Sequence, residues 1–541
     1  MSHHSMPPIG LIISVVVILL LGTICLGLTG GQNPSRPHVL IIYADQHRFD
    51  CLRAMGNPDV KTPHLDALAR DGALFRHSFC TWPVCTPSRY SLLSGQAVRQ
   101  HRGSTNRATL LPGTATFANR LREAGYHTTA VGKMHFTPAY LDVGFSELKL
   151  AEQNGRGRLV DDYHRYLKER GLVDSVDLID QERPFRDEAP DEYWKTFGAG
   201  VSNLPEEHHS TTWIGNRAVE TLAQWRPDQP GLLMVGFIKP HHPFDPPAPW
   251  DKMYDPAKLT ALPGWTEEPL ARDLEHGRGY FDNRTLTLPA LRRVMAYYYA
   301  TISQLDAQVG RMIEVLKQKG LYDNTLIIYT ADHGEFLGFH HLLLKGNHMY
   351  DPLVKVPLVI KFPGERYAGT VSEALVSSVD VTSTILDAAG LEPGADMRGR
   401  PLGPVCAGAS PGREVVVAEQ NAYLCVRSRN RKLLYTSAPR GSLFFDLEKD
   451  PLEMQNLLDD PRYQSDVRHL KDTLLRWFQT ETQTSAYVDL QARQIHQPNV
   501  PPDRMAAEKE MEEYLNLQMR RVLGAIKGTP GSSMYGSPNQ R

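Results

Sequence analysis

Five short apolar runs, separated by longer amphipathic segments, dominate the middle of the chain. They are rich in β-branched and other apolar residues and span 38–44, 126–131, 232–238, 324–331 and 356–362. Continuous apolar runs of this length are typical of strands buried on both faces. Because helical patterns alternate with them, the sequence predicts an α/β fold in which a large, mostly parallel sheet is sandwiched by helices.

The intervening segments predict helices of different lengths. These lie at 62–75, 116–124, 212–225, 291–316 and 382–389. In 291–316 the apolar residues recur along one stripe, which indicates a long helix that faces the core. Residues 147–207 are charged and poor in apolar runs, so we expect an irregular or helical insertion over the main domain.

Beyond about residue 411 the pattern changes to short strands separated by turns. They lie at 414–419, 423–428, 432–436 and 442–446 and predict a smaller antiparallel sheet, with a helix over 463–480 packed on it. A further helix is expected at 504–526, followed by a disordered tail. We therefore divide the chain into an N-terminal segment with its linker (1–35), a main α/β domain (36–410), a C-terminal α+β subdomain (411–500) and a helix with tail (501–541).

The N-terminal segment contains an apolar run, 9–28, that is long enough to cross a bilayer as one helix. A cleaved signal peptide normally has a shorter apolar stretch, so we favour a membrane anchor over a cleaved signal. A lipid anchor at Cys25 is disfavoured because Ile24 precedes it, and a buried helix because a linker follows at 30–35. A membrane anchor, a cleaved signal and a lipid anchor would all place the rest of the chain outside the cytoplasm. The protein would then be membrane-anchored or secreted, in the periplasm or the secretory pathway.

The composition argues against nucleic-acid binding and does not decide whether the cysteines form disulfides. The 541 residues carry a formal charge of −2 and include no long basic run or zinc-ligand cysteine pattern, so no nucleic-acid partner is expected. Six cysteines are too few to define the fold. Four of them could pair in an oxidising compartment or remain buried thiols: Cys51, Cys80, Cys406 and Cys425.

Polar residues follow four of the apolar runs at their C-terminal ends. They are Asp45-Gln46, Lys133 with His135, His241, and Asp332-His333. Because the carboxyl ends of parallel strands share one edge of a sheet, these residues are expected to meet. Two carboxylates, an amide oxygen and an imidazole favour a hard divalent cation such as Ca²⁺ or Mg²⁺. Taken singly, each Asp could instead cap a helix.

The segment Cys85-Thr86-Pro87-Ser88-Arg89 presents a Cys in a loop that enters a helix within one turn. Backbone N–H groups and the helix dipole favour negative charge there, and Arg89 lies one turn further along the helix. An anion site and a buried Cys beside a Pro-initiated helix explain this local pattern equally well.

This pentapeptide, followed by Ser91-Leu92-Leu93-Ser94-Gly95, resembles the signature of type I sulfatases, the formylglycine-dependent branch of the alkaline phosphatase superfamily. The resemblance covers almost the whole chain, including the smaller C-terminal subdomain. It implies that a formylglycine-generating enzyme oxidises Cys85 to an aldehyde, whose hydrate attacks the sulfur of a sulfate ester and forms a sulfated enzyme.

The resemblance also implies roles for the residues at the strand ends. One divalent cation, Ca²⁺ or alternatively Mg²⁺, would be bound by Asp45, Gln46, Asp332, His333 and the modified Cys85. Arg89, Lys133 and Lys345 would stabilise the charge of the transition state. His241 would protonate or assist the departing alcohol, and His135 would take the proton of the remaining hydroxyl to expel sulfate.

Two positions depart from the pattern common in the family. Many members have Asp where this chain has Gln46, and often Asn where it has His333. The amide removes one negative charge from the metal shell, so we predict a more electrophilic but weaker metal site. Asn106 is a candidate substrate contact, and His242 is interpreted as a structural neighbour.

Two other functions remain open at this point. A phosphonate monoester or phosphodiester hydrolase would share the modified Cys and an Asp-Gln metal pair, but such relatives lack the Lys-x-His that stands here as Lys133 and His135. An inactive membrane-tethered binder of sulfated glycans would need the cations but not both Cys85 and His135. An exported sulfatase most often meets sulfated polysaccharide, so a sulfated glycan is the expected substrate, with choline sulfate or aryl sulfate as alternatives.

Overall fold

The structure is a computed structural model that describes Met1, 36–275, 277–436, 441–481, Arg504 and 507–527. The chain divides into a short N-terminal unit, Met1–Arg36, and a larger compact unit, Pro37–Arg541. The apolar run at 9–28 and the tail beyond 527 lie outside the described residues, so the predictions of an anchor and of a disordered tail stay predictions. Within the ranges that the structure does describe, there is no helix with the length and apolar character needed to cross a membrane.

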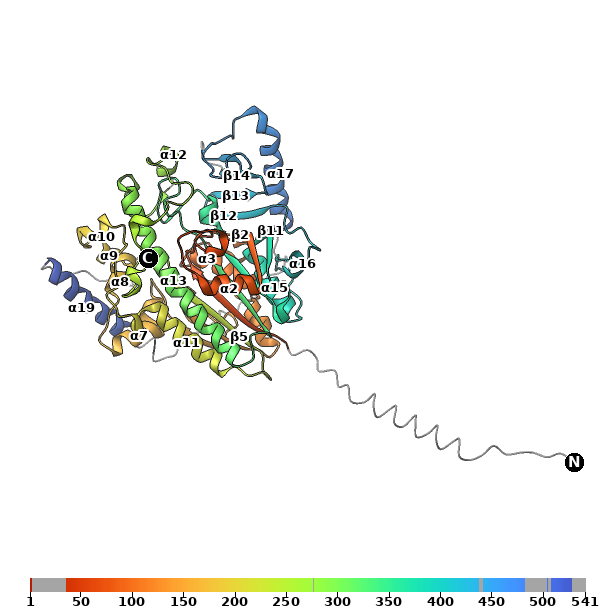
Figure 1. The fold of residues 1–541 in the computed structure, drawn as a ribbon, viewed down its shortest axis with the longest axis horizontal. Coiled ribbons are helices and arrows are strands. Elements are labelled where there is room, and N and C mark those ends of the chain that lie inside the picture. Colours follow the sequence, from red (N-terminus) through yellow and green to blue (C-terminus); the bar gives the residue numbers. More distant parts are fainter. Residues whose placement is uncertain (2–35, 276, 437–440, 482–503, 505–506, 528–541) are drawn as a thin grey trace. The chain divides into compact units, whose positions relative to one another are not determined.

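A nine-stranded sheet forms the centre of the larger unit (Figure 1). Its strands are β1 (His38–Asp45), β2 (Ala73–Phe79), β3 (His127–Gly132), β4 (Glu147–Leu150), β5 (Gly231–Pro240), β7 (Thr325–Ala331), β9 (Lys355–Val356), β10 (Leu358–Lys361) and β11 (Thr370–Ser377). They run in the order β11-β2-β10-β7-β1-β5-β3-β4, and β9 pairs with β2 beside this path. The β7-β1-β5-β3-β4 part is parallel throughout, which confirms the predicted mostly parallel α/β sheet.

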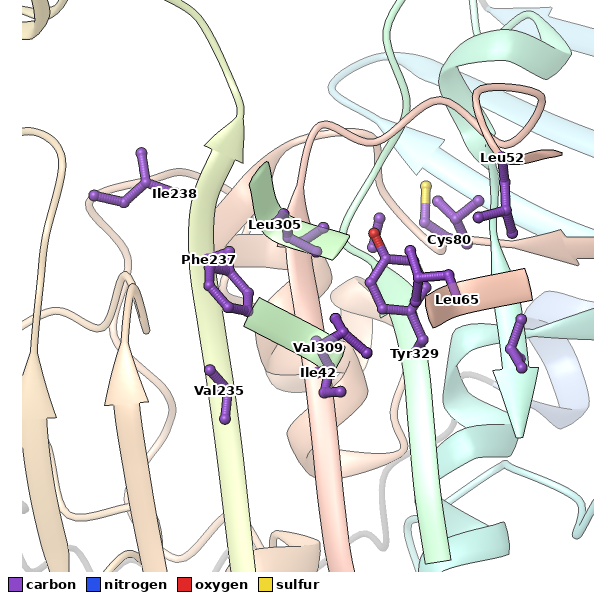
Figure 2. Close-up of a cluster of buried hydrophobic side chains, with 14 of the residues drawn as sticks. Ile42, Leu52, Leu65, Cys80, Val235, Phe237, Ile238, Leu305, Val309 and Tyr329 are labelled. Atoms are coloured by element: carbon purple, nitrogen blue, oxygen red, sulfur yellow. The ribbon is translucent and has the colours of Figure 1, made fainter. Parts of the chain in front are cut away.

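Both faces of the sheet are covered by helices. On one face Ile42 of β1 packs in a cluster with Leu305 and Val309 of α13 (Leu288–Gln318), as Figure 2 shows. On the other face the neighbouring Ile41 joins a cluster built by α3 (Cys85–Ser94), α5 (Phe117–Glu123) and α15 (Ser378–Ala388). Successive side chains of a strand point to opposite faces of the sheet, and here both faces are buried under helices. This is why β1 is apolar from Val39 to Ala44.

The helix predicted over 62–75 is wrong in its last four residues, 72–75. The helix α2 (Pro63–Asp71) ends before Gly72, and Ala73 begins β2. At Gly72 the chain passes so close to β10 that a Cβ atom would lie 2.4 Å from the carbonyl oxygen of Ile360. Only Gly fits this approach, and it stops the helix one residue before the strand begins.

The fifth predicted strand, 356–362, also differs from the expectation. Its central part is β10, which runs antiparallel to both β7 and β2. The sequence did not predict β11, which pairs in parallel with β2 at the edge of the sheet. Strand direction depends on the route of the connecting chain, and an apolar run carries no information about that route.

The C-terminal region contains the predicted antiparallel sheet. It consists of β12 (Val416–Gln420), β13 (Tyr423–Arg427), β14 (Arg431–Thr436) and β15 (Leu443–Asp446) in consecutive order. The helix α17 (Gln464–Thr480) packs on this sheet (Figure 1). Leu470 belongs to the same buried cluster as Leu433 and Phe444. The domain boundaries proposed from the sequence stay predictions.

The insertion between β4 and α11 (Ser210–Gln224) is mostly helical, as expected. It contains the short helices α6 (Gly157–Val160), α7 (Asp162–Glu169), α8 (Ser175–Gln181), α9 (Arg183–Arg186) and α10 (Asp191–Lys195). The predicted helix at 504–526 is α19 (Glu508–Lys527), which contacts α6 and α7. Residues distant in sequence therefore combine to build one side of the molecule.

The four cysteines left open by the sequence are all unpaired thiols. Cys51, Cys80 and Cys425 are buried, and Cys406 is partly buried. The structure thus shows the buried-thiol alternative, in which a free Cys packs as a small hydrophobic residue.

Candidate active site and metal centre

Four neighbouring parallel strands, β7, β1, β5 and β3, end at one edge of the sheet. Asp45 is the last residue of β1, and the residue after the end of each other strand also carries a polar group: Asp332 after β7, His241 after β5 and Lys133 after β3. All four residues are buried. The structure therefore brings together the strand-end residues that the sequence pattern predicted to meet.

Cys85 is the first residue of α3 and faces this edge. Its Sγ lies 3.5 Å from Asp45 Oδ1, 3.4 Å from His333 Nε2 and 3.6 Å from Lys345 Nζ. Only 1% of Cys85 is exposed. The thiol is thus enclosed by a carboxylate, an imidazole and an ammonium group.

Arg89, one turn along α3, clamps the two carboxylates of the site. Its Nη2 donates to Asp45 Oδ2 and its Nε donates to Asp332 Oδ2, each over 3.0 Å. Lys133 Nζ lies 2.8 Å from the same Oδ2 of Asp45. Buried carboxylates are stable only when they are paired in this way. Because the cations hold the Oδ2 atoms, the Oδ1 atoms are the ones that approach the thiol and the imidazole.

The donor set at this edge fits a divalent cation. One ligand atom from each of Asp45, Cys85, Asp332 and His333 lies within 4.8 Å of the others. His333 Nδ1 is 2.9 Å from the carbonyl oxygen of Gly334, so Nδ1 carries the proton and Nε2 is the acceptor, at present 3.2 Å from Lys345 Nζ. The fifth predicted ligand, Gln46, has a buried Oε1 atom with no hydrogen-bond partner in the described part of the chain.

Local charges favour an anion at Cys85. Burial and the Asp45 carboxylate raise the pKa of the thiol, but Lys345 and Lys133 outweigh them and lower it to about 6. Burial and Asp45 raise the pKa of Asp332 to about 6. The pKa of Asp45 itself is held well below its usual range, against the effect of burial, by Lys133 and Arg89, which both contact its Oδ2. The position of Cys85 therefore suits a group that carries negative charge.

His241 and Lys345 form a pair beside the thiol. Lys345 lies on β8 (Lys345–Gly346), which pairs with β6 (Gly277–Arg278), and its Nζ is 3.3 Å from His241 Nε2. His241 Nδ1 donates to the carbonyl oxygen of His242 over 2.7 Å, so Nε2 is the acceptor. Burial and the neighbouring cations hold the pKa of His241 well below its ordinary value. The proton of this pair therefore resides on Lys345.

His135 and Asn106 lie on the Thr86 side of Cys85. The Thr86 hydroxyl donates to the carbonyl oxygen of His135 over 2.9 Å, and the Thr86 N–H donates to Asn106 Oδ1 over 3.1 Å. His135 Nδ1 is buried and has no hydrogen-bond partner in the residues described. Burial and Lys133 lower the pKa of His135 to about 4, so its ring is neutral at pH 7 and can accept a proton.

A cavity of about 930 Å³ opens next to His135 and Asn106. Its walls come from the insertion, with Asn154 and Arg156, and from the C-terminal helix α19, with Glu508. This volume lies near the upper end of the range that is usual for small-molecule sites. The mixture of amides and charged groups suits a ligand rich in hydroxyl groups.

Three buried residues that support the site were not predicted. Gln153 Oε1 accepts from Lys133 Nζ over 2.9 Å, and Glu152 Oε1 accepts the backbone N–H of His135 over 2.9 Å. Glu335 accepts a hydrogen bond from the Gln46 amide. Glu335 could have been identified from its position in Asp-His-Gly-Glu directly after a buried strand. No sequence pattern in the insertion identifies residues 152–153 as part of the site.

Comparison with known proteins links this architecture to one family. Residues 37–391 match the model of the family described as Sulfatase, and residues 338–480 match the C-terminal region of N-sulphoglucosamine sulphohydrolase. The chain is 29% identical to an arylsulfatase of Clostridium perfringens over 84% of its own length and 96% of the relative's length. It is also 29% identical to a choline-sulfatase of Rhizobium meliloti, over 90% and 98% of the two chains.

A solved structure shares both fold and sequence similarity with the chain. The phosphonate monoester hydrolase of Agrobacterium radiobacter superposes with a TM-score of 0.69 at 27% identity. The match covers 82% of this chain and 96% of the hydrolase.

Proposed function

The chain belongs to the sulfatase family of the alkaline phosphatase superfamily and is a sulfuric ester hydrolase, and we propose that it uses a formylglycine made from Cys85 together with one divalent cation. We further propose that its substrate is a sulfated glycan and that it works outside the cytoplasm, anchored or secreted through its N-terminal segment. A formylglycine-generating enzyme would then be its partner during maturation.

The observation that carries the proposal is the environment of Cys85. Asp45, His333 and Lys345 each lie within 3.6 Å of its Sγ atom, and Arg89 and Lys133 hold the carboxylates behind it. An aldehyde hydrate at this position supplies a hydroxyl that attacks sulfur and a second hydroxyl that allows sulfate to leave, which a thiol cannot provide.

The proposed cation would be held by Asp45, Gln46, Asp332 and His333 together with the oxygen of the modified Cys85. Oxygen ligands predominate, so Ca²⁺ is the first choice and Mg²⁺ the alternative. When bound, the ion would lower the pKa of the attacking hydroxyl and balance the charge of the sulfate group.

Two sets of residues would move protons. Lys345 carries the proton that it shares with His241 Nε2, so this pair is placed to protonate the departing alcohol. His135, neutral and with an open Nδ1, is suited to accept the proton of the second hydroxyl. Arg89 and Lys133 would stabilise the negative charge that develops on the sulfuryl oxygens.

The glycan assignment rests on the cavity beside His135 and on the match to the C-terminal region of N-sulphoglucosamine sulphohydrolase. Asn106, at the junction of the cavity and the Cys85 helix, would contact the substrate next to its sulfate group. Choline sulfate is too small to fill a cavity of this size, although it would reach the same catalytic groups.

Two measurements test the proposal. Mass spectrometry of the peptide that contains Cys85, from protein coexpressed with a formylglycine-generating enzyme, should detect the aldehyde, and the variant Cys85→Ala should hydrolyse no sulfate ester. Release of sulfate from a panel of sulfated glycans, 4-nitrophenyl sulfate and choline sulfate should then be fastest for a glycan. An unmodified thiol in an active enzyme would refute the formylglycine.

A phosphonate monoester hydrolase is the second candidate, favoured by the similarity to the enzyme of Agrobacterium radiobacter. A phosphonate monoester and an aryl sulfate should be compared as substrates of one preparation. We expect the aryl sulfate to have the higher kcat/KM, because Lys133 and His135 stand where the sulfatase pattern has its Lys-x-His.

A further inference from the structure

Glu335 is a fully buried carboxylate with no role in the chemistry above. Its Oε1 accepts the backbone N–H groups of Leu337, over 3.1 Å, and of Leu344. Its Oε2 accepts a hydrogen bond from Nε2 of Gln46. The two oxygens therefore have separate tasks: one holds the backbone of the loop that leads to Lys345, and the other holds the side chain of Gln46.

The backbone of Gln46 is fixed on both sides. Its N–H donates to Asp332 Oδ1 over 3.0 Å, and its carbonyl oxygen accepts from the Tyr298 hydroxyl over 2.6 Å. Its φ of 62° lies in the left-handed region, where a side chain is tolerated only when surrounding contacts hold it. The main freedom left to this residue is which end of its amide faces Glu335.

An amide has one donor end and one acceptor end, and a carboxylate can only accept. In the structure the NH₂ of Gln46 faces Oε2 of Glu335. The opposite atom, Oε1, is then turned away from Glu335, and it is buried without a hydrogen-bond partner in the described part of the chain. A buried carbonyl oxygen without a partner is costly unless a ligand satisfies it.

We propose that Glu335 is a positioning residue that turns the carbonyl oxygen of Gln46 toward the divalent cation. The inference rests on the metal site of the proposed function. An Asp at position 46 would need no such partner, because both of its oxygens can bind a cation. Gln can bind through one end only, and the wrong end would present N–H groups to a positive charge.

The substitution Glu335→Gln tests this directly. The amide introduced at position 335 can keep its oxygen on the two backbone N–H groups, so its NH₂ takes the place of Oε2. Gln46 must then turn its own oxygen toward position 335 and its NH₂ toward the cation. We expect the melting temperature to stay close to that of the parent, while the dissociation constant for Ca²⁺ rises by about 10–100-fold.

A reciprocal exchange supplies the matched control. In the double variant Gln46→Glu/Glu335→Gln, the NH₂ at position 335 donates to one oxygen of the new carboxylate, and the other oxygen faces the cation. Ca²⁺ affinity should return to the parent's level or above it. Isothermal titration calorimetry with Ca²⁺ on the full chain measures all three proteins, and circular dichroism reports whether each is folded.

The outcomes separate this inference from the proposed function. Unchanged Ca²⁺ affinity in folded Glu335→Gln would overturn the positioning role alone, because the parent would still bind the ion. A folded exchange variant that binds Ca²⁺ as weakly as Glu335→Gln would overturn it too, and this variant decides the question if the single variant does not fold. A parent chain that binds none of Ca²⁺, Mg²⁺ and Mn²⁺ would remove both the metal site and the inference.

Discussion

Gln153 Oε1 accepts a hydrogen bond of 2.9 Å from Nζ of Lys133, and this contact joins the insertion to the catalytic edge of the sheet. Gln153 also donates through Nε2 to the carbonyl oxygen of His242, over 2.8 Å. That same carbonyl fixes the tautomer of His241. The amide of Gln153 thus supports both Lys133, which follows β3, and the imidazole of His241, which follows β5.

We expect Gln153→Leu to lower kcat by about tenfold, which corresponds to about 1.4 kcal/mol of transition-state stabilisation. Lys133 would keep Asp45 but lose its second partner, and its ammonium would move from the position in which we propose that it stabilises the sulfuryl oxygens. Steady-state kinetics with an aryl sulfate measures the effect. Gln181 provides the control, because its Nε2 donates to the same carbonyl of His242 over 2.9 Å. Equal losses of kcat in Gln153→Leu and Gln181→Leu would assign the effect to His242 instead of Lys133.

The ion pair between Arg156 and Glu508 places the C-terminal helix at the wall of the cavity. We expect Glu508→Ala to raise KM for a sulfated oligosaccharide several-fold and to leave KM for 4-nitrophenyl sulfate unchanged, because only the larger substrate reaches this wall. Glu510→Ala is the matched control, since Glu510 lies on the same helix as Glu508 but pairs with Lys168 of α7 and does not line the cavity. An equal rise of KM for both substrates would show that the ion pair acts through the fold and not through the cavity.

Gly132, the last residue of β3, is required by close packing as well as by its backbone conformation. Its φ is +90°, and a Cβ atom would lie 2.1 Å from the carbonyl oxygen of Gly236. We expect Gly132→Ala to reduce the free energy of unfolding by about 1–3 kcal/mol more than Gly125→Ala. Gly125 has the same φ of +90° but has nothing within 4 Å of the added atom, so it isolates the backbone strain. Urea unfolding measures both variants, and equal losses would mean that β3 moves to accommodate the methyl group.

Asp306 on α13 should make stability depend on pH. Its carboxylate accepts the backbone N–H groups of His64 and Leu65, but burial raises its pKa from 3.8 to about 7. Between about pH 4 and pH 7 the folded chain retains a proton that the unfolded chain has released, so the free energy of unfolding falls as the pH rises, by at most about 1.4 kcal/mol per pH unit. Asp306→Asn should remove this contribution. Denaturant unfolding at several pH values tests it, and parallel pH profiles for parent and variant would contradict it.

The sequence predicted which strand-end residues meet better than it predicted the residues that support them. Asp45 and Asp332 could be placed together because each follows an apolar run, and parallel strands deliver their carboxyl ends to one edge. Gln153 and Glu335 could not be placed, because their partners are fixed only when loops from distant parts of the chain pack against that edge. Side-chain hydrogen bonds of this kind have no periodicity in the sequence.

The errors in the fold have a similar origin. The segment 62–75 has helical spacing, but the close approach of Gly72 to Ile360 ends the helix, and that contact is tertiary. The strand β10 was found from its apolar run, whereas its antiparallel direction was not. Local patterns therefore identified where most elements lie, and packing between elements decided their direction and exact ends.

The burial of Cys85 would restrict when the proposed conversion to an aldehyde can take place. Only 1% of Cys85 is exposed, because its thiol is enclosed by the start of α3, the sheet edge and the loop that carries Lys345. A second enzyme therefore cannot reach the thiol in the folded chain. Conversion to the aldehyde, as proposed, would have to occur while this stretch is still extended, during synthesis or export. Chain that folded before meeting the modifying enzyme would remain a permanently inactive thiol form.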